Sequence, residues 1–126
     1  MKHEEFRLQQ AVCRWLSIQH PKVIYMSDTI ANMKITPQAQ LRNKSIQKAG
    51  FHCPDLILFE PRGKWHGLFI ELKIKSPYKK DGSLLKNEHL QNQSDSMYLL
   101  RERGYYCVFG WEFDQITEII NEYLDL

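Results

Sequence analysis

Apolar residues near the N-terminus recur at helical spacing. They form one stripe of Leu8, Ala11, Val12, Trp15 and Leu16. Steps of three and four residues place these side chains on a single helical face, which predicts a helix over residues 3–19 that packs against a core. Pro21 is expected to end this helix, because proline cannot continue the hydrogen-bond ladder.

A second helix is predicted to begin at Pro37. Proline suits the first helical turn, Thr36 can cap that turn, and Gly50 lies just beyond the expected end. The segment holds few large apolar residues, so we expect much of it to face solvent. Before it, residues 27–36 are mixed in character and predict a loop.

Two more helices are predicted in the second half of the chain. One runs from about residue 88 to 103 and ends at Gly104, a residue type that often terminates helices. The other covers about residues 112–124, with an apolar face of Phe113, Ile116, Ile120 and Leu124.

Short apolar runs bounded by turn residues predict the strands. We expect these strands at residues 23–26, 54–59, 67–73 and 105–109. The middle two form a hairpin through the Pro- and Gly-containing turn at 61–64. Helix, hairpin, helix, strand and helix in this order predict an α/β fold, with a mixed central β-sheet flanked by helices on both faces. No repeat or composition break divides the chain, so residues 1–126 are expected to form a single domain.

The composition narrows the class of protein. Hydrophobic residues make up 43% and charged residues 25%, which argues against wholesale disorder, and a net charge of +2 is too small to diagnose nucleic-acid binding. The three cysteines form no CxxC pair, which favours a reducing compartment, and the adjacent pair His52–Cys53 has too few ligands for tetrahedral zinc. No run approaches the ~20 apolar residues of a membrane span, and the acidic N-terminus is unlike a signal peptide. A cytoplasmic protein without a membrane partner is expected.

The predicted hairpin gathers charged residues on one surface. A turn centred near Gly63 sets Asp55 across from Glu71, where cross-strand Cβ atoms lie ~5 Å apart and like charges normally destabilise the pair. A divalent cation removes that penalty, because hard cations bind carboxylate oxygens. Lys73 is two residues from Glu71 and points to the same face. This arrangement is suited to metal-assisted hydrolysis.

Each of these residues also has a simpler interpretation. Asp55 could be a strand-entry aspartate, and Glu71 could form a structural ion pair with Lys73. Glu71 interrupts the near-continuous apolar run 68–72, which indicates burial on both faces of a strand. A buried carboxylate is costly unless it is paired or bound to metal, so a solvated glutamate is a poor explanation.

Residues on the flanking helices compete for a place beside the hairpin. Glu5 lies in line with the inward stripe of the first helix, so we prefer it to Glu4, although acidic residues are favoured in any first helical turn. Gln93 shares a helical stripe with apolar residues, whereas Gln91 is expected to face solvent. A core-facing glutamine needs polar partners, which a metal-bound water or a phosphate oxygen would provide.

Two clusters of cations could contact DNA phosphates without reading the base sequence. One lies in the loop that follows the hairpin and contains Lys75, Lys79, Lys80 and Lys86. The other lies on the second helix and contains Arg42, Lys44 and Lys48. Either cluster could equally be a solvated surface.

Taken in order, these motifs resemble the VRR-NUC family, the virus-type replication-repair nucleases of the PD-(D/E)xK superfamily. The matching elements are Glu5-x-x-x-Gln9, Gly50-x-x-x-Pro54-Asp55-Leu56, Glu71-Leu72-Lys73, Gln93 and Gly104. They cover nearly the whole chain, and the stretch 60–73 looks especially like small phage members. A Pro-Asp with a Glu-x-Lys is common by chance, but all five elements in order form a fairly specific signal.

The resemblance implies a restriction-endonuclease-like core and a deoxyribonuclease that depends on Mg²⁺ or Mn²⁺. By analogy, Asp55, Glu71 and the backbone carbonyl of Leu72 hold the metal, and Glu5 completes the acidic set. Lys73 would position or activate the attacking water and stabilise the charge that develops on the phosphate.

No base-reading module is evident, so cleavage is expected to select DNA structure (junctions, flaps or ends) rather than sequence, in replication, recombination or repair. A chain this small is expected to act as a homodimer, in the cytoplasm of a bacterial or phage-infected cell. The alternatives are a catalytically inactive DNA-binding module of the same fold and a sequence-specific restriction-type endonuclease.

Overall fold

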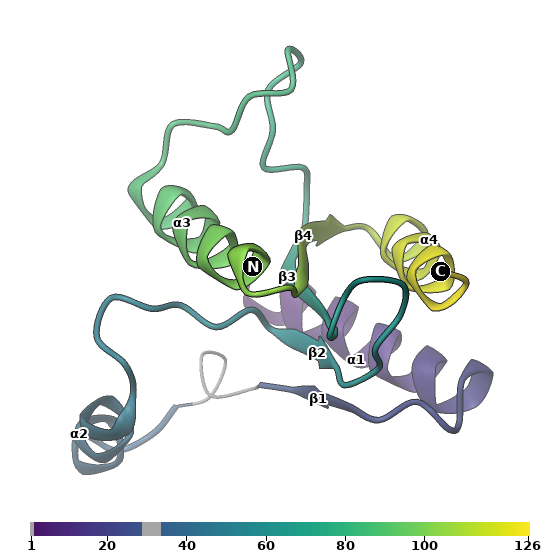
Figure 1. Cartoon of the computed structure of the whole chain (residues 1–126). Helices are drawn as coiled ribbons and strands as arrows, with labels where there is room; N and C mark the ends of the chain where they lie inside the picture. Colours follow the sequence, from purple (N-terminus) through teal and green to yellow (C-terminus); the bar gives the residue numbers. More distant parts are fainter. Residues whose placement is uncertain (1, 29–33) are drawn as a thin grey trace.

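The computed structural model describes residues 2–28 and 34–126. The helices and strands in these parts of the chain are α1 (Lys2–Gln19), β1 (Tyr25–Ser27), α2 (Pro37–Ile46), β2 (Leu56–Leu58), β3 (Leu68–Lys73), α3 (Glu88–Glu102), β4 (Tyr106–Trp111) and α4 (Phe113–Leu124). This α/β architecture confirms the predicted fold class. Figure 1 shows the sheet at the centre, with helices on both sides of it. None of the described helices is long and apolar enough to cross a membrane.

The strands form one mixed sheet in the order β1-β2-β3-β4. The first two pairings are antiparallel and β3–β4 is parallel. In the β2–β3 ladder, Leu56 pairs with Ile70, so the pairing continues to Asp55 and Glu71 at the next position. β4 extends two residues beyond the predicted strand, because Gly110 and Trp111 still pair with the end of β3.

The two faces of the sheet are covered by different helices. One face packs against α1 and α4, and its buried cluster contains Val12, Leu16, Leu56, Leu58, Leu68, Ile70, Leu72, Ile116, Ile120 and Tyr123. The other face packs against α3, and its cluster contains Leu90, Met97, Cys107 and Phe109. Alternation along β3 therefore turns Phe69, Glu71 and Lys73 toward the α3 face. Burial of β3 from both sides agrees with its near-continuous apolar run.

Gly110 allows α4 to pack closely against the sheet. A Cβ atom at this position would lie 2.8 Å from Ile70 Cγ2 and 2.9 Å from Ile116 Cγ1. Both neighbours are fully buried, so neither can move without disturbing the core.

The hairpin loop is longer than predicted. β2 ends at Leu58 and β3 begins at Leu68, so residues 59–67 connect them. The turn itself lies where the sequence indicated: the N–H groups of Arg62 and Trp65 donate to each other's carbonyl oxygens at 3.1 and 2.9 Å. Between them, Gly63 has a φ of 54°, a backbone conformation that favours glycine.

Helix α2 lies apart from the core. Thr36 caps it as predicted, since its hydroxyl accepts the N–H of Ala39 at 3.1 Å. The predicted end near Gly50 is wrong, because Gln47 leaves the helical conformation with a ψ of 149° and stops the helix after Ile46. None of its residues is buried, and Figure 1 shows it standing away from the sheet. Part of the loop predicted before it, residues 29–33, lies outside the described residues.

The segment 75–87 is a loop, as predicted, and it has a local fold of its own. Tyr78 and Leu84 form an isolated bridge, and Lys79 N–H donates to the Ser83 carbonyl at 2.7 Å. The Tyr78 ring lies edge-on to Phe109 and Trp111, at centroid distances of 6.0 and 5.7 Å. These contacts anchor the base of the loop on β4, while its outer part projects from the body (Figure 1).

Candidate functional site

Asp55 and Glu71 meet where β2 begins and β3 ends. Asp55 is the residue just before β2, and its Oδ2 accepts the N–H of Leu72 at 2.9 Å. Glu71 is only 2% exposed and lies on the face covered by α3. The sequence prediction that these carboxylates face each other across the hairpin agrees with the register of the sheet.

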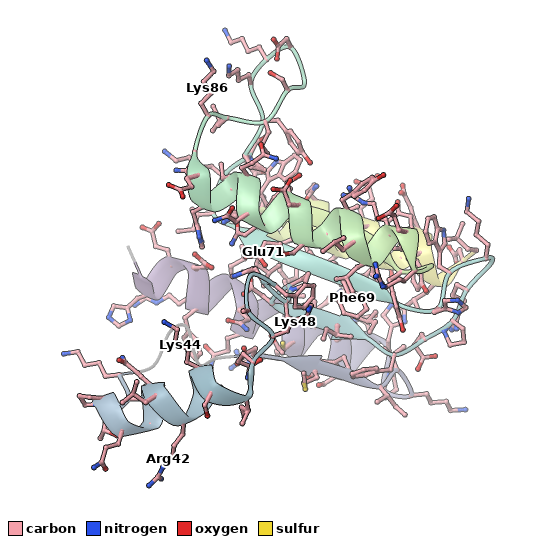
Figure 2. All side chains as sticks on the ribbon, turned by 60° about the vertical axis from the view of Figure 1, so that its left-hand side comes forward. Arg42, Lys44, Lys48, Phe69, Glu71 and Lys86 are labelled. Atoms are coloured by element: carbon pink, nitrogen blue, oxygen red, sulfur yellow. The ribbon has the colours of Figure 1, made fainter. Side chains whose placement is uncertain are left out.

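Gln93 reaches Glu71 from α3. Its Nε2 donates to Glu71 Oε2 at 2.8 Å, and its side chain is also 2% exposed. Figure 2 shows Glu71 on the sheet just below α3. Gln91 instead lies on the exposed side of α3, where its Nε2 donates to Asp95. Gln93 is therefore the glutamine that points inward, as its place on the apolar stripe predicted.

Two histidines complete this cluster, and the sequence did not indicate either of them. In the sequence His52 stands out only through its neighbour Cys53, yet its Nε2 lies 3.5 Å from Glu71 Oε1 and 3.3 Å from Gln93 Nε2. His89 Nε2 lies 3.2 Å from Gln93 Nε2, and the two imidazole rings are edge-on at 5.6 Å. His89 precedes Gln93 by four residues, a spacing that puts both on one helical face and that could have revealed it.

Burial and a neighbouring negative charge both act on the carboxyl group of Asp55. The pKa of Asp55 is raised to about 8, first by burial and then by the charge of Glu71. The pKa of His52 is also raised, mainly because its ring lies next to the Glu71 carboxylate, which favours the protonated imidazole. Without a cation, burial and the charge of Glu71 therefore favour the protonated form of Asp55.

Two buried oxygens in the site have no hydrogen-bond partner: Glu71 Oε1 and Gln93 Oε1. Both atoms are acceptors, so the missing partner would be a donor or a cation. The donor set thus fits a divalent metal. In the described residues, no three carboxylate, imidazole or thiol groups already surround one point. The remaining ligands of such a cation would come from the backbone, water or substrate.

Glu5 and Lys73 lie at the edge of this cluster. Glu5 is half-buried on α1, and its charge contributes to raising the pKa of Asp55; Glu4 is exposed. Lys73 is half-buried at the end of β3, and its charge acts on His52. Among the described side-chain contacts, Glu71 binds Gln93 and approaches His52, which does not favour the alternative of a Glu71–Lys73 ion pair. Metal binding by Glu5 and by the Leu72 carbonyl stays a prediction.

Gln9 fixes the backbone next to Asp55. It is 4% exposed, and its Nε2 donates to Ser27 Oγ at 2.6 Å and to the Asp28 carbonyl at 2.7 Å. Ser27 Oγ and the Asp28 N–H in turn donate to the Asp55 carbonyl, each at 3.0 Å. The motif that joins Glu5 and Gln9 in sequence therefore links α1 to the backbone that carries Asp55.

The predicted DNA-binding cations lie on two projections from the body. Arg42, Lys44, Lys48, Lys75, Lys79 and Lys80 are all exposed. In Figure 2, Lys44 lies on the side of α2 that is turned toward the sheet, and Lys48 lies on the segment that follows α2. Arg42 points away from the sheet. Glu71 appears in that view between α2 and the loop that carries Lys86. The structure therefore places one cationic projection on each side of the carboxylates.

Comparison with solved structures gives a similarity over most of the chain. No family model and no curated protein matches the sequence. A solved structure named "VRR_NUC domain protein" superposes with a TM-score of 0.63 and 26% sequence identity. The alignment covers 97% of this chain and 88% of that chain.

Proposed function

Since the chain belongs to the VRR-NUC family of nucleases, we propose that it is a metal-dependent endonuclease that hydrolyses DNA phosphodiester bonds. The observation that carries this proposal is the facing pair Asp55 and Glu71, with one Glu71 oxygen buried and unpartnered. Such a pair is unfavourable in the bare protein and becomes favourable when a divalent cation binds. An intact carboxylate pair with a neighbouring lysine also favours catalysis over a purely DNA-binding role.

Asp55, Glu71 and the Leu72 carbonyl would hold Mg²⁺ or Mn²⁺, with Glu5 as a further acidic ligand from α1. When bound, the cation supplies Lewis acidity at a phosphoryl oxygen and lowers the pKa of water. Gln93 engages Glu71 Oε2 and leaves Oε1 facing the site. Asp55 gives up its proton on loading and stays oriented by the Leu72 N–H.

Lys73 acts on the substrate side of the same face. Its ammonium group stabilises the negative charge that builds on the phosphate oxygens as water attacks phosphorus. The P–O3′ bond breaks, which gives a 5′-phosphate and a 3′-hydroxyl. Gln93 supports this geometry by holding Glu71 in place from α3.

The cations on α2 and on the loop after β3 would hold the DNA backbone on either side of the carboxylates. Arg42, Lys44, Lys48, Lys75, Lys79 and Lys80 supply this contact without reading bases. We therefore infer selectivity for DNA structure (junctions, flaps or ends) in replication, recombination or repair. A homodimer would present two such sites to a two-sided substrate, in the cytoplasm of a bacterial or phage-infected cell.

The test is a panel of labelled duplex, single-stranded, flap and four-way-junction DNAs incubated with Mg²⁺, Mn²⁺ or EDTA. We expect cleavage of branched DNA with either metal and none with EDTA. Glu71→Ala and Lys73→Ala should lose cleavage while keeping the wild-type circular dichroism spectrum. Cleavage that survives EDTA or the Glu71→Ala change would overturn the proposal. Sedimentation of the wild type with and without DNA reports its oligomeric state.

A further inference from the structure

The amide nitrogen of Gln93 lies near more polar atoms than it has hydrogens to donate. Its Nε2 lies within hydrogen-bond distance of Glu71 Oε2 at 2.8 Å, His89 Nε2 at 3.2 Å and His52 Nε2 at 3.3 Å. An amide nitrogen has only two hydrogens, and an ionised carboxylate only accepts. Glu71 accepts one of these hydrogens and the nearer imidazole, His89, accepts the other, so the His52 nitrogen has no hydrogen bond to Gln93.

The leftover His52 nitrogen faces the unpartnered oxygen of Glu71. The distance from His52 Nε2 to Glu71 Oε1 is 3.5 Å, which is beyond the usual length of a hydrogen bond. When two ligand atoms each lie ~2.1 Å from one metal ion at octahedral or tetrahedral angles, the two atoms are ~3.0–3.4 Å from each other. The separation of these two atoms is thus close to that of neighbouring ligands on a metal.

The position of His52 is fixed from two directions. Its backbone N–H donates to Ser96 Oγ on α3 at 2.8 Å, and Ser96 is buried. Its ring packs edge-on against His89. The His52 side chain is nevertheless 39% exposed, so a cation from solvent can reach it without opening the core.

We propose that His52 Nε2 is a nitrogen ligand of the metal site, beside Glu71 Oε1. This inference rests on the proposed metal-dependent function and adds an imidazole to its oxygen ligands. Among divalent cations, Mg²⁺ strongly prefers oxygen, Mn²⁺ accepts an imidazole nitrogen more readily than Mg²⁺ does, and the later transition metals bind imidazole more tightly still. The site therefore selects Mn²⁺ over Mg²⁺, and His52 is the residue that confers the selectivity.

The experiment measures metal binding in the absence of DNA. Pulsed EPR of bound Mn²⁺ detects coupling to a ligating nitrogen, and calorimetry gives the affinities for Mn²⁺ and Mg²⁺. The variants are His52→Ala, His89→Ala and a matched control, His66→Ala. His66 is exposed, precedes β3 and contacts Gly104 and Tyr105, just after the C-terminal end of α3 and away from this cluster. Circular dichroism of each variant checks that it is folded.

We expect nitrogen coupling in the wild type, in His89→Ala and in His66→Ala, and none in His52→Ala. His52→Ala should lower Mn²⁺ affinity by ~10–100-fold and leave Mg²⁺ affinity within ~3-fold. Absent coupling in the wild type, coupling retained in His52→Ala, or no Mn²⁺ binding at all would each overturn the inference. DNA cleavage is measured separately. A nitrogen-ligated metal without cleavage would refute the proposed function alone, and cleavage with an all-oxygen site would refute this inference alone.

Discussion

The carboxyl group of Asp55 should make the metal-free protein less stable as the pH rises. Its pKa is raised from 3.8 to about 8 by burial and by the charge of Glu71, whereas an unfolded aspartate loses its proton near pH ~3.9. Between about pH 4 and pH 8 the folded protein holds one more proton than the unfolded chain. The free energy of unfolding therefore falls with rising pH across this window.

The structure sets the size of the effect. The pKa of Asp55 rises from 3.8 to about 8 on folding. At about 1.4 kcal/mol per pH unit, the free energy of unfolding can fall by at most about 6 kcal/mol across this pH range. A domain of this size has about 5–15 kcal/mol of total stability, so even half of that loss is easily measured. His52 acts in the same direction: its pKa is raised from 6.5, so its contribution is complete below that pH and is lost as the pH rises through the folded pKa.

The assay is urea unfolding in EDTA at about pH 5, 7 and 9. Asp55→Asn keeps an oxygen that can accept the Leu72 N–H but has no charge to lose, so the decline with pH should become shallower. At high pH this variant should be more stable than the wild type. Asp114→Asn, at an exposed position in the first turn of α4, should keep the wild-type decline. An unchanged pH slope in Asp55→Asn would refute the reasoning, and saturating Mn²⁺ should remove the slope in the wild type because the cation replaces the proton.

Three further predictions concern metal, DNA and packing. Glu71→Ala should reduce metal-dependent DNA cleavage by on the order of 10³-fold or more in a gel assay, and residual activity near wild type would contradict its role. Lys79→Gln with Lys80→Gln should weaken DNA binding and reduce the slope of log affinity against log salt by ~0.9 for each lost duplex phosphate contact; Lys64→Gln, in the β2–β3 turn, is the matched control that should leave the slope unchanged. Gly110→Ala should destabilise the fold by about 1–3 kcal/mol, seen as a lower melting temperature, because its Cβ would press on buried side chains of both β3 and α4. An unaltered melting temperature would mean that the core repacks there.

The sequence predicts that Asp55 and Glu71 face each other because residues close together in the chain determine this pairing. The turn at Gly63 and the apolar pattern of the two runs together fix the register of the hairpin. Gln93 was predictable for a similar reason, since the periodicity of α3 shows which of its polar residues points inward. Both inferences use only the geometry of single elements and of one local pairing.

His52 could not be predicted in this way. It lies in the irregular segment between α2 and β2, where no periodicity gives the direction of a side chain. Its place is set by the hydrogen bond of its backbone to Ser96, 44 residues later in the chain. The end of α2 was missed for a related reason: the helix buries no residue, so packing does not determine its length, and the backbone turn at Gln47 has no strong sequence signal.

The residues of the site come from separate stretches of the chain, from α1 through the hairpin to α3. During synthesis, Asp55 and Glu71 emerge before Gln93, which lies on α3, the helix that covers their face of the sheet. A nascent chain or a fragment ending before α3 therefore has its two carboxylates but lacks the glutamine that orients Glu71. The competence to bind metal therefore requires α3 as well as the hairpin, so hydrolytic activity should begin only after α3 has been synthesised and has packed on the sheet.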